Sequence, residues 1–399
     1  MSFTIPSVGF PGQLFHQRGS LAQVRRLRGR RAALIVGQAS LEMGGHLVKV
    51  QGLLQAAGLD NEVLARVTED PSVTDVTDLG ARLSQYAPDW VIAIGGGAVI
   101  DSAKAGWISY EHPEINWSRV PNRFPRLRRK ARFLALPTTS GSGAEVSPWI
   151  VLRNPRSGAR ETFFTPEVMP DIAIIDSAVS GSQPRSVTAS SGFLALTHAL
   201  ESLSSPRRNG FADSFALHAL RMVLERLPRA FKQGEDREAR EALHVAGTLA
   251  GLARSNSTPG LTSAFAHAAG IFGIPHGLAA SLFLVPVLQL NMRAGALFDD
   301  IARRIGLENK EELLVAIYRL RSRVGLPDTI WDTEVNPDLV QQKSTELIER
   351  VVNDVGARGN LCRPSRQDLT AILALTQAQS SHPSREETSV MAPREPVTD

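Results

Sequence analysis

Residues 90–104 read WVIAIGGGAVIDSAK, and this stretch decides the fold. Its first five residues are apolar and rich in β-forming side chains, which is the pattern of a buried strand. Three glycines follow the strand, and a helix is expected to begin directly after them. A buried strand that turns through glycine into a helix is typical of a parallel β-sheet covered by helices.

The same pattern recurs on both sides of this stretch. Further buried strands are predicted by short apolar runs at residues 32–37, 62–67, 133–136 and 172–175. A helical apolar period occupies residues 41–57, between two of these strands. Strands separated by helices imply right-handed crossovers. We therefore predict an α/β domain with a parallel sheet over residues 1–182.

The β pattern fades after about residue 184. Apolar periods broken by Pro and Gly predict helices at residues 186–205, 211–227, 236–254, 262–272, 277–292, 295–305, 309–324, 338–355 and 366–379. We therefore predict an all-α second domain over residues 183–379. Residues 380–399 contain three prolines, many charges and few apolar side chains, which predicts a flexible tail.

Length and composition exclude several classes of protein. The 399 residues fit two domains with separate cores, and 43% apolar with 21% charged residues exclude a disordered or collagen-like chain. The sequence has no run of about 18 uncharged apolar residues, so no membrane span is expected. The first residues, MSFTIPSVGFPG, lack the pattern of a secretory signal, and the single Cys362 allows no internal disulfide. These features predict a soluble cytoplasmic protein.

Two clusters of basic residues raise the alternative of nucleic-acid binding. They lie at residues 25–31 and 119–132, each directly before a predicted strand. A nucleic-acid surface would need such patches together with aromatic platforms. Because the formal net charge is only +4 and solvated loops are expected at these positions, we expect no nucleic-acid partner.

The glycine turn, Gly95, Gly96 and Gly97, is the first candidate for function. Glycines let the backbone approach a ligand closely, and the N-terminus of the following helix adds partial positive charge. We therefore expect the turn to bind the pyrophosphate of a nucleotide, and Asp101, one helical turn further on, to belong to the same cofactor site. The alternative is a plain tight turn, since the sequence lacks the GxGxxG pattern of the ordinary dinucleotide fold.

A second loop with small polar residues follows the strand predicted at residues 133–136. It reads PTTSGSGAE over residues 137–145. Its hydroxyl groups, among them those of Thr138, Thr139 and Ser142, can donate to phosphate or carboxamide groups. Because ligands of parallel sheets bind at the carboxyl ends of the strands, we expect the two loops to clamp one extended nucleotide.

Three histidines in the helical half form the third candidate. His198 lies in an apolar helix, and His267 and His276 flank a short segment before the next helix. A single histidine on an apolar helix is more often a buried core residue than a functional group. Three of them favour a catalytic cluster, although the sequence leaves their convergence open.

Five segments carry a resemblance to a known family, in the order GGGAVIDSAKA, LPTTSGSGAEV, PDIAIIDSAVS, SGFLALTHALES and HAAGIFGIPHGLAAS. From about residue 8 to about residue 375, the chain resembles the iron-containing alcohol dehydrogenases of the dehydroquinate-synthase-like superfamily. The resemblance implies a Rossmann-like dinucleotide domain, a helical domain and an active site in the cleft between them. It also implies redox chemistry on small alcohols, aldehydes or ketones with NAD(P)(H), and a homodimer or larger homo-oligomer.

The resemblance further implies a divalent metal held by one Asp and three His, and this chain departs from that set. Leu194 stands at the Asp position and Ser263 at one His position. His198 and His276 match the two remaining ligands, and His267 matches an active-site His that is not a ligand. Since a catalytic metal site normally has at least three protein ligands, we predict no iron or zinc.

Without a metal, another group has to stabilise the negative charge that develops on the carbonyl oxygen. The retained His198, His267 and His276 are the obvious candidates. The apolar Leu194 beside them would disfavour a charged ring, so their protonation state stays open. Alternatively, Glu201 could complete a rebuilt metal site, because it lies three residues after His198 and can share its helix face.

The loop after the first predicted strand bears on the choice of cofactor. Many relatives that prefer NAD have an Asp there, whereas this chain reads GQAS over residues 37–40. This loop contains no acidic residue that would repel a 2′-phosphate. NADP is therefore favoured over NAD, with Gln38 as a hydrogen-bond donor to the cofactor. Asp70 falls at a nucleotide-contacting position of the family, although a turn explains it equally well. Arg160 matches a family Lys near the cofactor and could also hold an anionic group of the substrate.

The substrate pocket is expected to combine apolar and hydroxyl side chains, namely Trp149, Phe193, Leu194 and Ser263. We predict a metal-independent, NAD(P)H-dependent reductase of a small aldehyde, ketone or keto acid. Two other functions stay open at this point. One is a non-redox lyase or dehydratase on the same scaffold, and the other is a catalytically inactive relative that serves as a binding partner.

Overall fold

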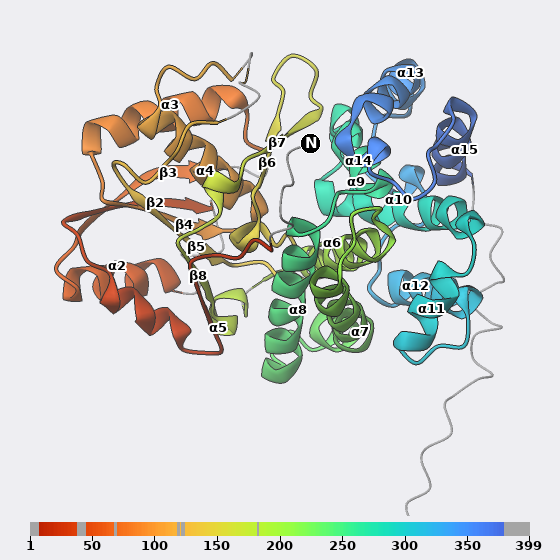
Figure 1. Ribbon diagram of the computed structural model, residues 1–399, viewed down its shortest axis with the longest axis horizontal. Coiled ribbons are helices and arrows are strands. Elements are labelled where there is room, and N and C mark those ends of the chain that lie inside the picture. Colours follow the sequence, from red (N-terminus) through yellow and green to blue (C-terminus); the bar gives the residue numbers. More distant parts are fainter. Residues whose placement is uncertain are drawn as a thin grey trace, which may run out of the picture.

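The computed structural model describes residues 8–37, 45–67, 70–117, 120, 124–181 and 183–378. The predicted cofactor residue Gln38 and the predicted tail at residues 380–399 lie outside this part of the chain, as does the start of the helix predicted at residues 41–57. Figure 1 shows two domains side by side, a sheet with its helices on the left and a helical domain on the right. This arrangement confirms the predicted fold class.

The N-terminal domain is built on a sheet of six described strands, all parallel, in the order β1-β8-β5-β4-β2-β3. The strands are β1 (Gln13–His16), β2 (Arg31–Gly37), β3 (Asp60–Val67), β4 (Trp90–Gly95), β5 (Arg132–Pro137) and β8 (Ile172–Ile175). All except β1 are predicted by the apolar runs of the sequence. β1 has no apolar run, because it lies at the edge of the sheet and its residues are mostly exposed.

The strands at the centre of the sheet are buried on both faces. In β2, Ala32, Leu34 and Val36 pack on one side, and Ala33 and Ile35 pack on the other. Because side chains alternate along a strand, each face needs its own cover of helices. One face is covered by η1 (Ser20–Arg26) and α2 (His46–Ala56), and the other by α3 (Val73–Tyr86) and α4 (Gly97–Glu111).

A β-hairpin reaches from the N-terminal domain toward the helical domain (Figure 1). It consists of β6 (Trp149–Arg153) and β7 (Arg160–Phe164), which pair antiparallel. The sequence does not predict it, because β7 is partly exposed along its whole length and lacks an apolar alternation. Short helical turns lie on either side of the hairpin, namely η2 (Ala144–Val146), η3 (Pro166–Val168) and α5 (Ser177–Ser180).

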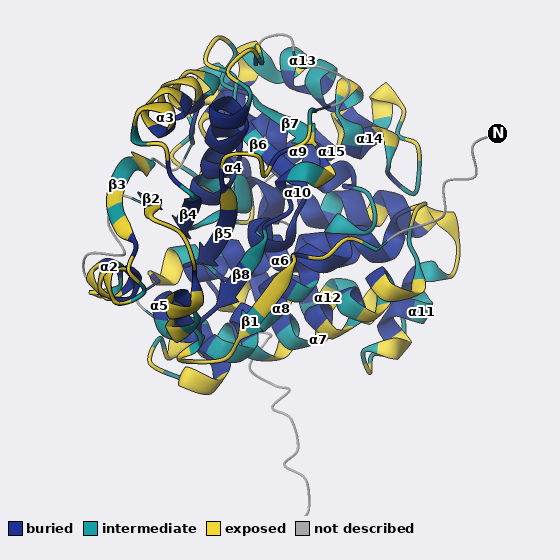
Figure 2. Cartoon of the chain, turned by 60° about the vertical axis from the view of Figure 1, so that its left-hand side comes forward, coloured by how far each residue is buried: buried dark blue, intermediate teal, exposed yellow. Residues whose placement is uncertain are grey.

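The second domain is helical throughout its described part, as the sequence predicts. Its helices are α6 (Arg185–Ser204), α7 (Gly210–Lys232), α8 (Arg237–Ser255), α9 (Leu261–Ala268), η4 (Ala269–Phe272), α10 (His276–Asn291), η5 (Met292–Ala294), α11 (Leu297–Arg304), α12 (Lys310–Arg323), η6 (Ile330–Asp332), α13 (Pro337–Asn353), α14 (Val355–Arg358) and α15 (Arg366–Gln377). One hydrophobic core joins α6, α7 and α8, and a second joins α9, α10, α13 and α15. α6 is buried along most of its length (Figure 2).

One described helical stretch, residues His276–Ala294, is apolar and long enough to cross a membrane by length and composition. Its apolar window is 72% buried inside the protein, and side chains such as Phe283 pack in the second hydrophobic core. The stretch is therefore a core helix of a soluble protein.

The loop that follows β5 is pressed directly against the helical domain. A Cβ on Gly143, which has a φ of +65°, would lie 2.3 Å from the Cα of Gly251 on α8. A Cβ on Gly141 would lie 1.8 Å from the carbonyl oxygen of Ser191 on α6. Such close approach of two backbones requires glycine. The loop and α8 therefore form one rigid contact between the domains.

A buried hydrogen bond reinforces this contact. The hydroxyl of Ser140 lies 3.0 Å from Nδ1 of His244 on α8. His244 is 2% exposed, and burial lowers its pKa from 6.5 to about 4. The ring is therefore neutral at neutral pH and can share a hydrogen with the hydroxyl.

Candidate functional site

The two loops that the sequence singles out lie next to each other at the carboxyl ends of β4 and β5. A Cβ on Gly97 would lie 2.8 Å from the Cβ of Ser142, and one on Gly96 would lie 3.2 Å from Cγ2 of Thr139. Even a methyl group at these positions would crowd the second loop. The glycines therefore allow the two loops to pack closely against each other.

The helix after the glycine turn is placed to bind an anion. α4 begins at Gly97, and the N–H of Thr138 donates to the carbonyl oxygen of Gly95 at 3.0 Å, which fixes the turn against the second loop. The first N–H groups of a helix have no carbonyl partner within it and carry partial positive charge. The residues present here fit the pyrophosphate of a dinucleotide.

Asp101 and Lys104 are buried behind the turn. Lys104 donates to the carbonyl oxygens of Ala144 and Ser147 at 2.7 and 2.6 Å, and burial lowers its pKa to about 8. Burial raises the pKa of Asp101 to about 6, although its Oδ2 accepts the N–H of Val151 at 3.0 Å and Lys104 lies nearby. Lys104 thus holds the second loop on α4, while contact between Asp101 and the cofactor stays a prediction.

Asp70 and Arg160, which the sequence predicts to bind the cofactor, are hydrogen-bonded to each other. Nε of Arg160 donates to Oδ1 of Asp70 at 3.0 Å. Its Nη1 donates to the carbonyl oxygens of Ala266 and Ile274 at 3.3 and 3.2 Å, and its Nη2 donates to Ile274 at 3.1 Å. Arg160 therefore joins the β6–β7 hairpin to the helical domain. With its donors committed in this way, it is poorly suited to hold an anionic substrate group.

The three histidines lie close together, a point that the sequence alone leaves open. The rings of His267 and His276 stack with centroids 5.1 Å apart and an interplanar angle of 12°. Both ring nitrogens of His198 and Nδ1 of His276 are buried and have no hydrogen-bond partner in the described part of the chain. Burial, followed by neighbouring positive charge, lowers the pKa of His198 and His276 well below 6.5. These two rings are therefore neutral at neutral pH and supply no positive charge to the site.

His267 differs from the other two because a carboxylate orients it. Its Nδ1 lies 3.0 Å from Oδ2 of Asp354, while its Nε2 has no partner among the described residues. Burial alone would raise the pKa of Asp354, but His267, the N–H of Gly356 and Arg254 together hold it below the usual value. The ionised Asp354 thus accepts the Nδ1 proton and leaves Nε2 facing the cluster, which is the geometry of a general acid–base group.

Asp354 is missed by the sequence reasoning, because it falls inside a helix predicted to span residues 338–355. The structure ends α13 at Asn353 and begins α14 at Val355. Asp354 caps α14, since its Oδ1 accepts the N–H of Gly356 at 2.7 Å. An Asp two residues before a Gly is the one local signal that could have indicated this break.

A second missed residue is Arg254, in the last turn of α8. It is 6% exposed, and its Nε and Nη2 are buried without a hydrogen-bond partner in the described residues. Burial lowers its pKa, against the attraction of Glu201, Asp101 and Asp354. Its positive charge in turn lowers the pKa of His198. The sequence gives no signal for it beyond a basic residue in an apolar helix.

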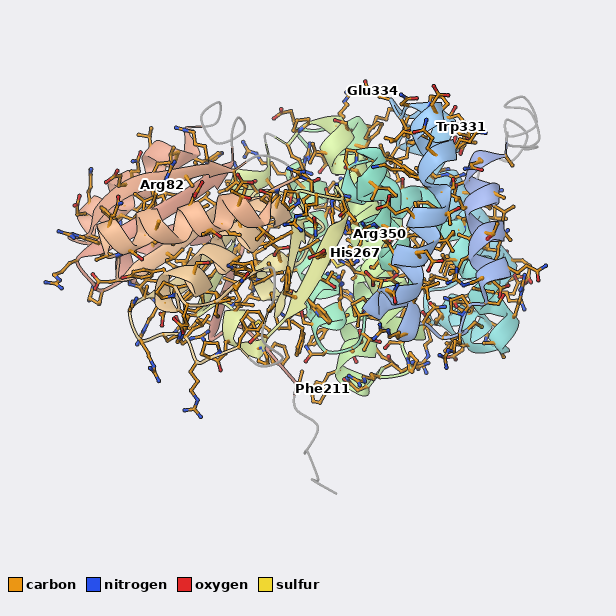
Figure 3. All side chains as sticks on the ribbon, turned by 90° about the horizontal axis from the view of Figure 1, so that it is seen from above. Arg82, Phe211, His267, Trp331, Glu334 and Arg350 are labelled. Atoms are coloured by element: carbon orange, nitrogen blue, oxygen red, sulfur yellow. The ribbon has the colours of Figure 1, made fainter. Side chains whose placement is uncertain are left out.

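A cavity of about 610 Å³ opens where β7 faces α9, α13 and α14. Its wall includes His267, Asp354, Arg160 and Arg350. Figure 3 shows His267 and Arg350 close together where the two domains meet. One member of the histidine cluster, His267, thus lines a cavity between the β6–β7 hairpin and the helical domain, which is the kind of place where small molecules bind.

The predicted pocket residues do not line this cavity. Leu194 lies one turn before His198 and packs in the second core, and Trp149 packs against Phe164 with ring centroids 4.8 Å apart. Phe193 is completely buried among the core side chains that join α6, α7 and α8. Contact between Phe193 and substrate stays a prediction, although its neighbour Leu194, and not Phe193, shares the helix face of His198.

Two family models match the chain over most of its length. The model described as iron-containing alcohol dehydrogenase matches residues 11–177, and the one described as the C-terminal part of the Fe-containing alcohol dehydrogenase family matches residues 188–376. The chain belongs to the iron-containing alcohol dehydrogenase family. It is therefore an NAD(P)-dependent oxidoreductase by family.

Relatives and solved structures agree with this family. The chain is 33% identical to the NADPH-dependent butanol dehydrogenase of Clostridium saccharobutylicum over 93% of this chain and 97% of the relative. It is 30% identical to an alcohol dehydrogenase of Thermococcus barophilus over 88% and 94% of the two chains. The iron-containing alcohol dehydrogenase of Thermococcus thioreducens superimposes with a TM-score of 0.85 at 29% identity, over 92% of this chain and 98% of that one.

A metal does not fit the residues that this chain presents at the family's ligand positions. Leu194 has no donor atom, and the hydroxyl of Ser263 donates to Oε2 of Glu201 at 2.6 Å. The N–H of Ser263 donates to the other oxygen of Glu201 at 2.7 Å, so this carboxylate is already engaged. In the described part of the chain, no three His, Cys, Asp or Glu side chains gather in a way that could hold an ion.

Proposed function

We propose that this member of the iron-containing alcohol dehydrogenase family is an NAD(P)H-dependent reductase of a small aldehyde, ketone or keto acid that works without a metal. The proposal rests on one observation: the hydrogen-bonded pair of His267 and Asp354 lies beside a metal-ligand set that is incomplete. The pair offers a proton donor at the cleft, while Leu194 and Ser263 remove two of the four ligands that the family resemblance implies.

The chain's own residues supply orientation and a proton. A bound NAD(P)H supplies the hydride, which the carbonyl carbon of the substrate accepts. The glycine turn before α4 would hold the pyrophosphate through backbone N–H groups. Nε2 of His267 would give its proton to the oxygen on which negative charge develops, and Asp354 would offset the positive charge on the ring before the transfer. In the direction of alcohol oxidation, the same nitrogen would take the proton.

NADPH is the coenzyme that we propose. The loop after β2 reads GQAS over residues 37–40 and contains no acid that would repel a 2′-phosphate. A relative with 33% identity is named an NADPH-dependent butanol dehydrogenase. Titration of the purified chain with NADPH and NADH, followed by nicotinamide fluorescence, tests this point. Tighter binding of NADH would contradict it.

Chelation tests the absence of a metal. The purified chain would be treated with a strong chelator, its metal content measured by mass spectrometry, and its oxidation of NADPH followed with aldehydes, ketones and keto acids. We expect turnover to persist after chelation. Loss of activity on chelation and recovery with Fe²⁺ or Zn²⁺ would reject the proposal. Conversion of a substrate without net oxidation of the coenzyme would favour a lyase or dehydratase instead.

Two general properties belong to the same proposal. We expect a cytoplasmic enzyme and a homodimer or larger homo-oligomer, as the sequence suggests for this family. Light scattering on the purified chain measures the assembly state directly, and a monomer at micromolar concentration would contradict it.

A further inference from the structure

Arg254 is a buried cation whose hydrogen-bonding capacity is not used. It lies in the last turn of α8 and is 94% removed from solvent, since only 6% of its surface is exposed. Nε and Nη2 of its guanidinium are buried and have no hydrogen-bond partner in the described residues. Burying a charge is costly unless it is paired, so two orphaned donors on one guanidinium indicate a position that a ligand completes.

The two orphaned donors form a geometric unit. In a guanidinium, the N–H of Nε and one N–H of Nη2 lie on the same edge and point in the same direction. This fork matches the two oxygens of a carboxylate, which it binds through parallel hydrogen bonds. A single carbonyl oxygen would satisfy the fork less well. The unused edge of Arg254 therefore favours an anion with two oxygens.

The carboxylates around Arg254 are committed to other partners. Glu201 accepts both the N–H and the hydroxyl of Ser263. Asp354 accepts from His267 and from a helix N–H, and Oδ2 of Asp101 accepts a backbone N–H of β6. Within the residues that the structure describes, none of these three carboxylates comes within the 4.0 Å of a salt bridge to Arg254. They surround the charge at longer range without occupying its donors.

Two other cations near the cluster, Lys104 and Arg160, already donate to protein oxygens. Lys104 donates to three carbonyl oxygens, those of Ala144, Ser147 and Trp149. Arg160 donates to Asp70 and to two carbonyl oxygens of the helical domain. The anchoring role that the sequence analysis gives to Arg160 thus fits Arg254 better.

We propose that Arg254 binds a carboxylate of the substrate, so that the enzyme reduces an oxo acid or a carboxylate-bearing aldehyde instead of a neutral carbonyl compound. This rests on the proposed reductase function. The proposal places the carbonyl group of the same substrate at Nε2 of His267. The carbonyl carbon gains the hydride of NAD(P)H, its π electrons move to oxygen, and that oxygen takes the proton from Nε2 of His267, which yields a hydroxy acid and NAD(P)⁺.

Matched substrate pairs test the wild-type enzyme without any variant. Succinic semialdehyde would be compared with its methyl ester, and pyruvate with its ethyl ester, because each pair differs mainly in one negative charge. We expect kcat/KM to be roughly 10- to 100-fold higher for the acid of at least one pair, as charged hydrogen bonds of this kind provide. Equal or better turnover of the neutral member in both pairs would overturn the proposal.

Variants locate the effect at Arg254. Arg254→Met removes charge and fork, Arg254→Lys keeps the charge alone, and Arg221→Met on the exposed face of α7 is the matched control. We expect Arg254→Met to raise KM for the preferred acid roughly 10- to 100-fold, to raise KM for the ester far less, and to leave the Kd of NADPH unchanged. Arg254→Lys should recover part of the loss. A fall in kcat of equal size for acid and ester, with unchanged KM, would place Arg254 at the carbonyl oxygen and overturn the proposal.

Binding measurements separate this proposal from the reductase function. Calorimetric titration of the NADPH-loaded enzyme with butyrate, and with butyramide as the neutral counterpart, requires no turnover. Binding of butyrate alone, lost in Arg254→Met, would support the anchor even if no carbonyl compound were reduced. Reduction of neutral aldehydes together with no preference for butyrate would reject the anchor and leave the reductase function standing. Circular dichroism would show whether Arg254→Met folds, and the wild-type titration decides if it does not.

Discussion

His267 and Asp354 define the site at the scale of single residues. Their hydrogen bond sets which nitrogen of the ring is left without a partner, in the way that a buried carboxylate fixes the tautomer of catalytic histidines. The neighbouring His198 and His276 are held neutral by burial. One ring of the three is therefore suited to carry a proton to the substrate.

Replacement of Asp354 by Asn tests this assignment. Asn keeps the cap of α14, because its side-chain oxygen can still accept the N–H of Gly356, but it removes the negative charge. We expect kcat to fall roughly 100-fold, the size of a typical general acid–base contribution, with NADPH affinity unchanged. Steady-state kinetics with the best carbonyl substrate measures the effect.

The exposed Asp338 on α13 provides the control, since Asp338→Asn makes the same chemical change without touching the site. Circular dichroism would check that both variants are folded. Full activity of Asp354→Asn would exclude the pair from the proton transfer.

Residues in the site differ in how far the sequence reveals them. The glycines and histidines stand out because their residue types have few other uses in those places. Asp354 and Arg254 do not, since an acid at a helix junction and a basic residue in the last turn of a helix are common everywhere. Only the convergence of α8, α9 and the α13–α14 junction gives them a role, and no local pattern contains that information.

At the scale of elements, the turn between β4 and α4 is constrained by the loop beside it. The missing side chain of Gly97 makes room for Ser142 of the neighbouring loop. A methyl group there would displace one loop from the other, and hence alter the distance between the two halves of the nucleotide clamp.

Gly97→Ala is the corresponding test. The added Cβ would lie 2.8 Å from the Cβ of Ser142, so one loop has to move, at a cost of about 1–3 kcal/mol for overpacking. We expect the Kd of NADPH to rise roughly tenfold. Gly52→Ala is the control, because a Cβ on Gly52 in α2 meets no atom within 4 Å. Unchanged affinity in Gly97→Ala would show that the turn does not contact the coenzyme.

Strands and helices were predictable from the sequence where burial imposes a regular spacing of apolar residues. The central strands β2, β4 and β5 are buried on both faces and therefore read as apolar runs, and the helices of the second domain show their apolar period. The edge strand β1 and the β6–β7 hairpin have half-exposed residues, so their pairing leaves no such trace. Their position follows from tertiary contacts, among them the bonds of Arg160 to the helical domain.

At the scale of the whole molecule, stability should depend on pH through His244. An unfolded chain protonates this residue near pH 6.5, whereas the folded chain does so only near pH 4. Between these values the unfolded state binds more protons, so stability is complete above pH 6.5 and falls as the pH drops toward 4, by up to about 3 kcal/mol.

His244→Asn should remove this dependence while keeping a partner for Ser140. Urea unfolding at pH 7 and pH 5 measures the free energy of unfolding at both conditions, and the difference should be smaller in the variant by about 2 kcal/mol. The exposed His218, changed in His218→Asn, is the control. An identical difference in wild type and His244→Asn would contradict the prediction.

The seating of the loop after β5 on α8 has a kinetic consequence. Gly251, which touches Gly143, lies three residues before Arg254 on the same helix. A dinucleotide bound to this loop would therefore also hold α8 in place, and α8 carries Arg254, the proposed anchor for the carbonyl substrate. We expect compulsory-order addition, in which the coenzyme enters first and leaves last.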